Sequence, residues 1–191
     1  MLASAVSDLG LLQQVAAAPP TVLFWGRESP GTSSKEVGDA LAGISERLGE
    51  QKNHRTEPDV ILDFGRAGVV FFEAKLGSSN DSKDNAQHHW DKYVLGTPAF
   101  RDAEMAIGTR LYQLARNWRF AYELADDRPF CLANLVVSKQ GEALEPFARS
   151  LATTDERQFR EITWAELVAA GGSTPPWLLE YLQGPGISLS S

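Results

Sequence analysis

Two kinds of hydrophobic spacing alternate along the chain, and together they predict helices interspersed with strands. Between residues 34 and 49, apolar side chains recur at spacings of three and four, which is typical of a helix with one buried stripe. Residues 102–125 repeat this pattern over a longer stretch, so we expect one long helix there. Short apolar runs bounded by turn residues predict strands at 21–26, 59–64, 69–76, 129–137 and 159–164.

Weaker patterns complete the predicted order of elements. An N-terminal helix is expected to end by Pro19-Pro20, and further helices are expected at 86–93, 141–152, 164–170 and 175–183. Thr163 is placed to cap the helix that follows it. No repeat or wide linker divides the 191 residues, so we expect a single domain. Mixed helices and strands in this order favour an α/β sandwich with helices on both faces of a mixed sheet.

Composition narrows the classes of function. Cys131 is the one cysteine and lies in an apolar run, which excludes a disulfide framework and a cysteine-based metal site. We therefore expect a reducing, cytoplasmic location, and no apolar run is long enough to cross a membrane. The net charge of −7 argues against a surface that grips nucleic acid over its whole extent. It leaves room for an acidic metal site with a local basic lining.

Charged residues end the most apolar strand of the chain, at Glu73-Ala74-Lys75. If residues 65–67 form a three-residue hairpin loop, Phe64 pairs with Gly68 and Asp59 falls opposite Glu73. Two carboxylates and an ammonium group then converge on one face of the sheet, whereas a slip of one residue would separate them. Carboxylates on adjacent strands suit Mg²⁺, and a nearby lysine can position a water for attack on a phosphodiester.

Pro58-Asp59, followed by a hairpin and by Glu73-Ala74-Lys75, resembles the PD-(D/E)xK nuclease superfamily, which includes restriction enzymes, junction resolvases and repair nucleases. The resemblance covers residues 33–138, with residues 1–32 as an N-terminal extension and residues 139–191 as C-terminal helices and a short strand. It implies a restriction-endonuclease-like three-layer sandwich with a mixed central sheet flanked by helices. It also implies metal-dependent hydrolysis of phosphodiester bonds in nucleic acid, with DNA as the expected substrate and a homodimer as a plausible way to cut two strands.

The resemblance further implies roles for individual residues. Mg²⁺, or Mn²⁺ in its place, would be held by two carboxylates and a backbone carbonyl, and a lysine would orient the attacking water. A glutamate on the preceding helix and a polar residue on the following helix would complete the site. In this order the matching residues are Asp59, Glu73, the carbonyl of Ala74, Lys75, Glu36 and Gln113.

Each of these residues has a simpler interpretation as well. The hairpin charges could form an ordinary cross-strand ion pair at a solvated strand end. Glu36 follows Ser33 in the pattern of a capping box, and Gln113 fits a solvated helix face. A second acid-x-lysine triplet, 81–83, lies in a polar loop, which shows how readily the bare motif arises by chance. A binding protein that keeps the nuclease fold without catalysis is therefore the alternative hypothesis.

Other polar residues carry weaker signals. Arg110, Arg116 and Asn117 are candidate contacts to nucleic acid. Arg110, Gln113 and Asn117 form a polar stripe at spacings of three and four, for which a solvated helix face is the favoured interpretation. Asp63 shares the predicted face of Asp59, so it is either an extra ligand or an acid near the turn. Adjacent histidines at 88–89 cannot both face one metal on a helix, and we expect them to be exposed.

Overall fold

The computed structural model describes residues 2–13, 19–24, 27–28, 35–51, 58–75 and 90–171. In these residues the strands are β1 (Thr21–Phe24), β2 (Arg27–Glu28), β3 (Val60–Asp63), β4 (Val69–Ala74), β5 (Phe130–Val136) and β6 (Arg157–Thr163). The α-helices are α1 (Leu2–Asp8), α2 (Lys35–Arg47), α3 (Trp90–Tyr93), α4 (Ala103–Gly108), α5 (Tyr112–Ala125), α6 (Glu145–Ser150) and α7 (Trp164–Ala170). Two 3₁₀ turns are added at η1 (Gly65–Ala67) and η3 (Gly141–Leu144).

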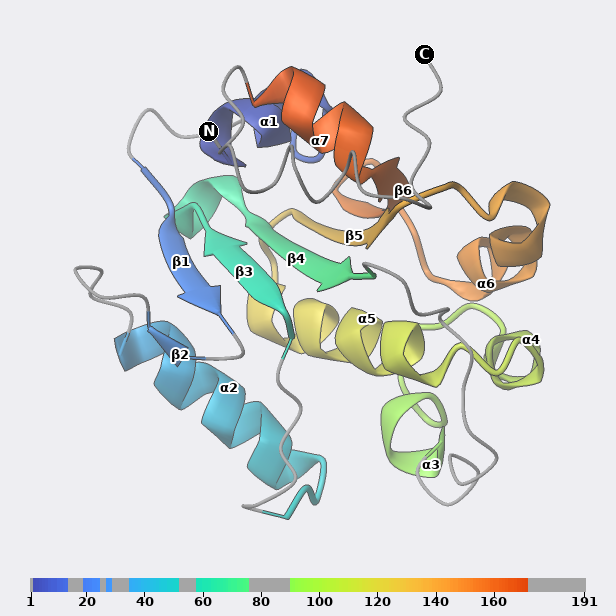
Figure 1. Cartoon of the computed structure of the whole chain (residues 1–191). Coiled ribbons are helices and arrows are strands. Elements are labelled where there is room, and N and C mark those ends of the chain that lie inside the picture. Colours follow the sequence, from blue (N-terminus) through green and yellow to red (C-terminus); the bar gives the residue numbers. More distant parts are fainter. Residues whose placement is uncertain are drawn as a thin grey trace.

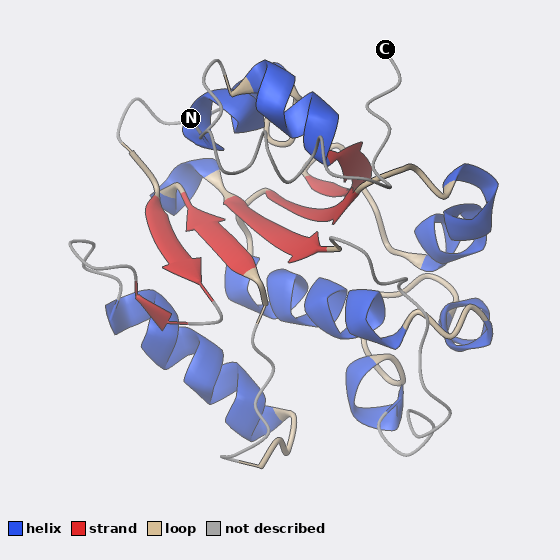
Figure 2. Ribbon diagram, in the orientation of Figure 1, coloured by secondary structure: helices blue, strands red, loops and turns tan. Residues whose placement is uncertain are grey.

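The strands form one six-stranded mixed sheet in the order β2-β1-β3-β4-β5-β6 (Figures 1 and 2). β3 pairs antiparallel with both β1 and β4, whereas β4, β5 and β6 run parallel to one another. The parallel half requires crossovers, which α5 and α6 supply. β4 is thus the strand at which the antiparallel hairpin meets the parallel half of the sheet.

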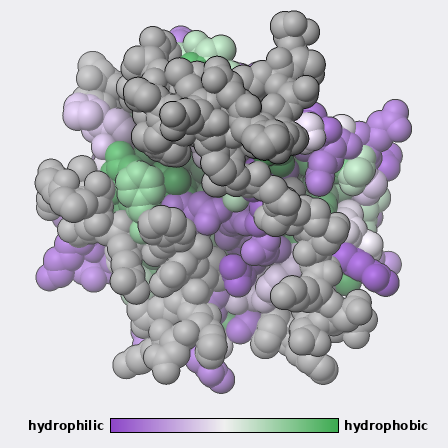
Figure 3. Space-filling model, in the orientation of Figure 1, coloured by the Kyte–Doolittle hydropathy of each residue, from purple (hydrophilic) through white to green (hydrophobic). Residues whose placement is uncertain are grey.

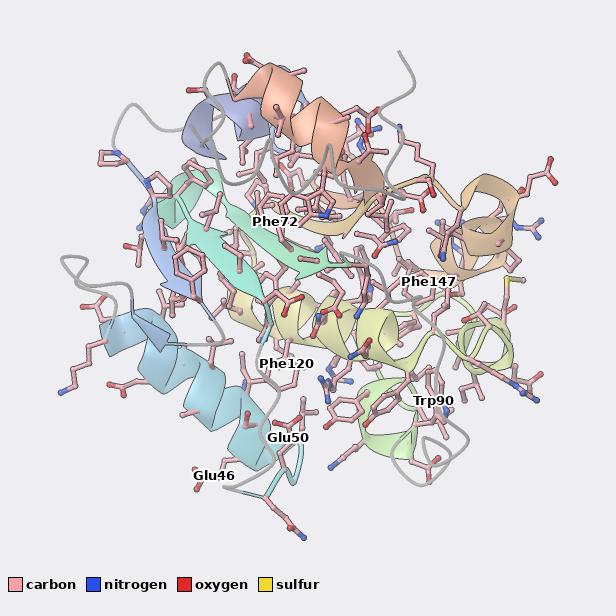
Figure 4. All side chains as sticks on the ribbon, in the orientation of Figure 1. Glu46, Glu50, Phe72, Trp90, Phe120 and Phe147 are labelled. Atoms are coloured by element: carbon pink, nitrogen blue, oxygen red, sulfur yellow. The ribbon has the colours of Figure 1, made fainter. Side chains whose placement is uncertain are left out.

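Each face of the sheet is covered by helices, which confirms an α/β sandwich. On one face, apolar side chains of β3 and β4 pack with residues of α2, α3 and α5. On the other face, alternate side chains of the same strands pack against α1 and α7. Figure 4 shows the two layers through Phe72, which lies on the α1 and α7 side, and Phe120, which lies on the opposite side. Every residue of β5 is buried, as expected for a strand covered on both faces.

The prediction of one long helix over 102–125 is wrong, because two helices occupy the stretch. Asp102 accepts the backbone N–H of Met105 through its side chain and so caps α4. The helix stops after Gly108, a poor helix former, and Arg110 adopts a left-handed φ of 60° that no helix interior accepts. α5 therefore starts in a new direction at Tyr112.

The remaining element predictions agree with the structure where it describes them. All the predicted strands are present, with ends that shift by a few residues, and Thr163 caps α7 in a capping box with Glu166. The predicted helix at 175–183 and the residues around His88 lie outside the described residues. None of the helices in the described ranges is long and apolar enough to span a membrane.

Candidate active site

The hairpin of β3 and β4 has the predicted register. Asp63 pairs with Val69 and Val60 pairs with Phe72, and the backbone N–H of Phe64 donates to the carbonyl of Gly68 at 2.9 Å. Continuing this pairing by one residue places Asp59 opposite Glu73. The odd loop length of residues 65–67, together with the alternation of buried side chains, accounts for this register.

Gly68 makes the hairpin turn possible. Its φ of 131° is one that side chains disfavour, and a Cβ atom there would lie 2.5 Å from the carbonyl oxygen of Pro129. The chain just before β5 thus lies against the end of the turn, and the N–H of Val69 donates to the same Pro129 carbonyl at 3.0 Å. This close approach anchors the hairpin beside β5.

Glu73 and Lys75 form an ion pair at the carboxyl end of β4. They stand two residues apart, so they project from the same face of the strand. The Lys75 Nζ donates to Oε1 of Glu73 at 2.5 Å and to Oε1 of Gln113 at 2.7 Å. The other oxygen of Glu73, Oε2, accepts the Nδ2 donor of Asn117 at 2.6 Å. Two residues of α5, one turn apart, therefore hold the pair in place.

Asp59 joins this group through the backbone. Its Oδ2 accepts the N–H of Ala74 at 2.7 Å, so its carboxylate lies against the peptide that joins Glu73 to Ala74. Asp59 is half-buried, whereas Glu73 is 6% and Lys75 8% exposed. The structure thus brings together Asp59, Glu73, Lys75 and Gln113, which we call the hairpin-end cluster together with Asn117.

Burial gives the ion pair its significance. A charged group removed from water is costly unless a partner of opposite charge and hydrogen bonds compensate it, and here both are present. Since Asp59 and Glu73 oppose a single ammonium group, the three charged groups carry a formal charge of −1. Figure 3 shows hydrophilic surface in the middle of this face, over the end of β4 and α5. A divalent cation is the natural complement to such a group.

Three contributors to the site were not recognised from the sequence. Asn117 was expected as a contact to nucleic acid, but it is 1% exposed and donates to Glu73, so that interpretation is wrong. Trp164 donates its indole N–H to the carbonyl of Lys75 at 3.3 Å, which links α7 to the end of β4. Asn134 of β5 pairs with Glu73 in the sheet and is fully buried. The one sign of these contributors in the sequence was the polar residue Asn134 within the apolar run of β5.

The donor set fits a Mg²⁺ ion. Two carboxylates on neighbouring strands are the usual protein contribution, with waters supplying the remaining ligands. Asn117 adds an observation of its own, because its Oδ1 is buried without a hydrogen-bond partner among the described residues. An amide oxygen left without a donor beside Glu73 is a further oxygen of the type that hard cations accept. No group of three or more His, Cys, Asp or Glu that could hold a metal ion gathers in the described ranges.

Other predicted residues lie elsewhere. Glu36 is exposed in the first turn of α2 and makes no hydrogen bond or ion pair with the hairpin-end cluster in the part of the chain that the structure describes. Its predicted capping partner, Ser33, lies outside that part, as do the 81–83 triplet and the histidines at 88–89. Arg110 is exposed before α5, and Arg116 lines a pocket described below.

Asp63 belongs to the opposite end of the hairpin. Its side chain accepts the N–H of Gly65 at 2.7 Å and two contacts from Nη1 of Arg128 at 3.0 and 3.2 Å. These contacts agree with the simpler interpretation of Asp63 as an acid near the turn, and its place at the turn separates it from the hairpin-end cluster.

Comparison of the chain with protein-family models, with curated proteins and with solved structures gives no match.

Proposed function

We propose that the protein is a metal-dependent nuclease of the PD-(D/E)xK type that hydrolyses phosphodiester bonds, with DNA as the expected substrate. The observation that carries the proposal is the convergence of Asp59, Glu73 and Lys75 at the open end of the hairpin. A restriction-endonuclease-like arrangement agrees with the mixed sheet, in which the strand bearing the acid-x-lysine triplet lies between an antiparallel and a parallel neighbour.

Asp59 and Glu73 would hold Mg²⁺ or Mn²⁺, with the carbonyl of Ala74 as a third protein oxygen. The bound cation would neutralise the excess negative charge and polarise the phosphate that is attacked. Asn117 donates to the Glu73 carboxylate and keeps it oriented, and its Oδ1 is buried without a partner among the described residues. Glu36 is not required by this arrangement.

Lys75 would orient the water. An ammonium group has three donors, and among the described residues two of them go to Glu73 and Gln113. The third is available to a water molecule. The oxygen of that water forms a bond to phosphorus, one phosphorus–oxygen ester bond breaks, and the proton that the water loses is balanced by the one that the released sugar oxygen takes up. Gln113 acts as a positioning residue, because it holds the Lys75 ammonium without touching the reacting atoms.

A second candidate function rests on a different feature of the same residues. Both oxygens of Glu73 already accept hydrogen bonds from protein groups, as a purely structural ion pair requires. The protein would then be a non-catalytic binding protein that keeps the nuclease-type sandwich. This candidate predicts that removing the Lys75 charge alters stability and leaves binding to a partner unchanged.

Cleavage assays separate the two. Single-stranded and double-stranded DNA and RNA, each end-labelled, are incubated with Mg²⁺ or Mn²⁺ and wild type, Asp59→Asn or Lys75→Met. The nuclease proposal predicts cleavage of at least one substrate by wild type and its loss in both variants. Asp63→Asn is the matched control, since it removes a carboxylate charge from the same hairpin outside the cluster. Cleavage that persists in Asp59→Asn and Lys75→Met would overturn the proposal, as would no cleavage by the folded wild type.

A further inference from the structure

A cavity lies beside the hairpin-end cluster, between the end of α2, α3 and the first turns of α5. Its volume is about 420 Å³, and it is lined by residues 49–51, by Lys92 and Tyr93 of α3, and by Tyr112 and Arg116 of α5. Figure 4 shows Glu50 at the end of α2 and Trp90 on α3, both on the α5 side of the molecule. A cavity of this size is typical of sites for small molecules or for one unit of a polymer.

The lining is basic and aromatic. Lys92 and Arg116 contribute two positive charges, and each lies over a tyrosine ring, at 5.3 Å from the centroid of Tyr93 and 5.6 Å from that of Tyr112. Glu50 supplies the only carboxylate of the described lining, and it accepts the hydroxyl of Tyr93 at 2.5 Å. The lining therefore carries a formal charge of +1 in a chain whose net charge is −7.

The two phenols remain uncharged, so they do not cancel the cations. Burial raises the pKa of Tyr93, and the neighbouring Glu50 carboxylate raises it further. Burial likewise raises the pKa of Tyr112, although Arg116 opposes that change. Neutral phenols beside two cations form a wall that accepts an anion and offers apolar ring surface at the same time.

One donor in this wall has no partner. The Nε of Arg116 is buried and makes no hydrogen bond within the part of the chain that the structure describes. That atom is closed off from the cavity, but a guanidinium group has other N–H donors, and an anionic oxygen is the acceptor that they prefer. Arg116 thus brings a permanent positive charge to the cavity wall, and an anionic ligand is the complement to it.

The cavity and the cluster share the same helix turns. Tyr112 and Arg116 are four residues apart and lie on one stripe of α5, and Gln113 and Asn117 form the neighbouring stripe. In this neighbouring stripe, Gln113 accepts a hydrogen bond from Lys75 and Asn117 donates one to Glu73. A polymer whose scissile bond lies at the cluster would therefore place an adjoining unit at the cavity.

We infer that this cavity binds a phosphate-bearing nucleotide of the substrate strand next to the bond that is cut, an inference that rests on the proposed nuclease function. Arg116 and Lys92 contact the phosphate, and the tyrosine rings form the apolar wall beside the sugar or the base. The cavity would supply local positive charge for a phosphate in a chain whose net charge is −7.

Binding of a mononucleotide tests the inference without relying on catalysis. Deoxyadenosine 5′-monophosphate, deoxyadenosine and inorganic phosphate are titrated calorimetrically, in the absence of metal, into wild type, Arg116→Gln and Arg149→Gln. Arg149 lies on α6 and its side chain is 62% exposed, so its variant is the charge-matched control. We expect the monophosphate to bind wild type and the control equally, and to bind Arg116→Gln about tenfold or more weakly through the loss of a charge-assisted contact.

Each contrary result is informative. Equal binding of the monophosphate to wild type and Arg116→Gln, or no binding at millimolar concentration, would overturn the inference. Inorganic phosphate that binds as tightly as the monophosphate would overturn the nucleotide assignment. Lys92→Gln is the second variant, for use if Arg116→Gln does not fold, and the same weakening is expected.

Kinetics distinguish this inference from the proposed function. In Arg116→Gln we expect a raised KM with nearly unchanged kcat, because the contact is made equally in the ground state and the transition state. Cleavage with an unaltered KM would refute the cavity's role and leave the nuclease intact. Monophosphate binding that depends on Arg116, in a wild type that cuts nothing, would refute the nuclease and leave a nucleotide site.

Discussion

The two ends of the β3–β4 hairpin both bury a carboxylate against a cation, and they do so differently. At the turn, Arg128 contacts Asp63 and also donates to the carbonyls of Gly65 at 2.9 Å, Leu124 at 3.0 Å and Ala125 at 3.3 Å. The guanidinium group thereby ties the turn to the end of α5. Among the described residues, the other hydrogen bonds of the Arg128 side chain all go to backbone carbonyls.

At the open end, by contrast, the charged side chains form hydrogen bonds mainly with other side chains. Lys75 contacts Glu73 and Gln113, Asn117 contacts Glu73, and Asp59 lies half-buried beside them. An acceptor of Asn117 is left over among the described residues. A buried ion pair is therefore not itself a sign of function. At the turn end, Arg128 donates to backbone carbonyls as well as to Asp63. The open end has one carboxylate more than it has cations, and the Asn117 amide oxygen there has no partner among the described residues.

The largest expected effect separates the ends by activity. Lys75→Met removes the group that orients water, and we expect the rate of phosphodiester cleavage to fall by about 10²–10⁴-fold, the usual contribution of such a group. Arg128→Met should leave the rate per folded molecule within about twofold of wild type, since Arg128 is remote from the reacting atoms. End-labelled substrate measured by gel under single-turnover conditions provides both rates. Equal losses in the two variants would contradict the distinction between the ends.

The next effect separates them by stability. Arg128→Met leaves the buried Asp63 carboxylate without its cation, and breaking such a pair costs on the order of 3–5 kcal/mol of unfolding free energy. Urea unfolding followed by circular dichroism measures this loss. Asp63→Asn in the same background should recover part of it, because the unpaired charge is then gone. A loss below ~1 kcal/mol would show that the turn end is an ordinary surface ion pair.

Gly68→Ala tests the turn from the backbone. The added Cβ would meet the Pro129 carbonyl at 2.5 Å, and the φ of 131° disfavours any side chain. We expect a loss of about 2–3 kcal/mol from the strained conformation. Thermal unfolding measures it, with Gly65→Ala as a partner variant whose Cβ meets nothing within 4 Å, although its φ of 62° is also positive. If both variants lose the same amount, the contact with Pro129 contributes nothing.

The reactivity of Cys131 gives an independent measure of the loss of stability in these variants. Burial raises the pKa of its thiol to about 12, so near pH 8 the folded protein presents almost no thiolate. We expect iodoacetamide to modify Cys131 only through opening of the core, and faster in Arg128→Met than in wild type. Rapid modification of folded wild type at pH 8 would show that the β5 core is accessible.

The smallest effect concerns the support of the open end. Trp164→Phe keeps an aromatic ring, smaller than the indole, and removes the 3.3 Å hydrogen bond to the Lys75 carbonyl, whose loss costs about 0.5–1 kcal/mol. Denaturant unfolding detects such a change when the slope with denaturant is unaltered. A stability equal to that of wild type would show that neither the N–H nor the part of the indole that phenylalanine lacks contributes there.

The hairpin and its acidic end were predictable because the relevant information is local. A three-residue loop and alternating apolar positions determine which side chains of two adjacent strands share a face, so Asp59, Glu73 and Lys75 were expected together. The remaining features depend on tertiary packing. Nothing in residues 102–125 marks Arg110 as left-handed, and the periodicity of α5 continues through the break.

The way in which the helices pack on the sheet explains why the other features were not predicted from the sequence. The sequence alone predicts a surface position for Asn117, but the packing of α5 on the sheet brings its side chain into contact with Glu73. Glu36 has the spacing expected of a helix residue near the sheet, but the buried stripe of α2 comprises Leu41 and Ile44, and Glu36 is left exposed. The cavity joins segments around residues 50, 92 and 116, and no local pattern links segments that far apart.

Calorimetric titration of Mg²⁺ and Mn²⁺ into the metal-free chain tests the central claim most directly. Wild type, Asp59→Ala, Glu73→Ala and the turn-end control Asp63→Asn are compared with and without a DNA oligonucleotide. The account predicts that wild type and Asp63→Asn bind the cation and that both cluster variants lose this binding. Absence of cation binding to folded wild type, even with DNA present, would contradict it, as would unchanged binding in Asp59→Ala and Glu73→Ala.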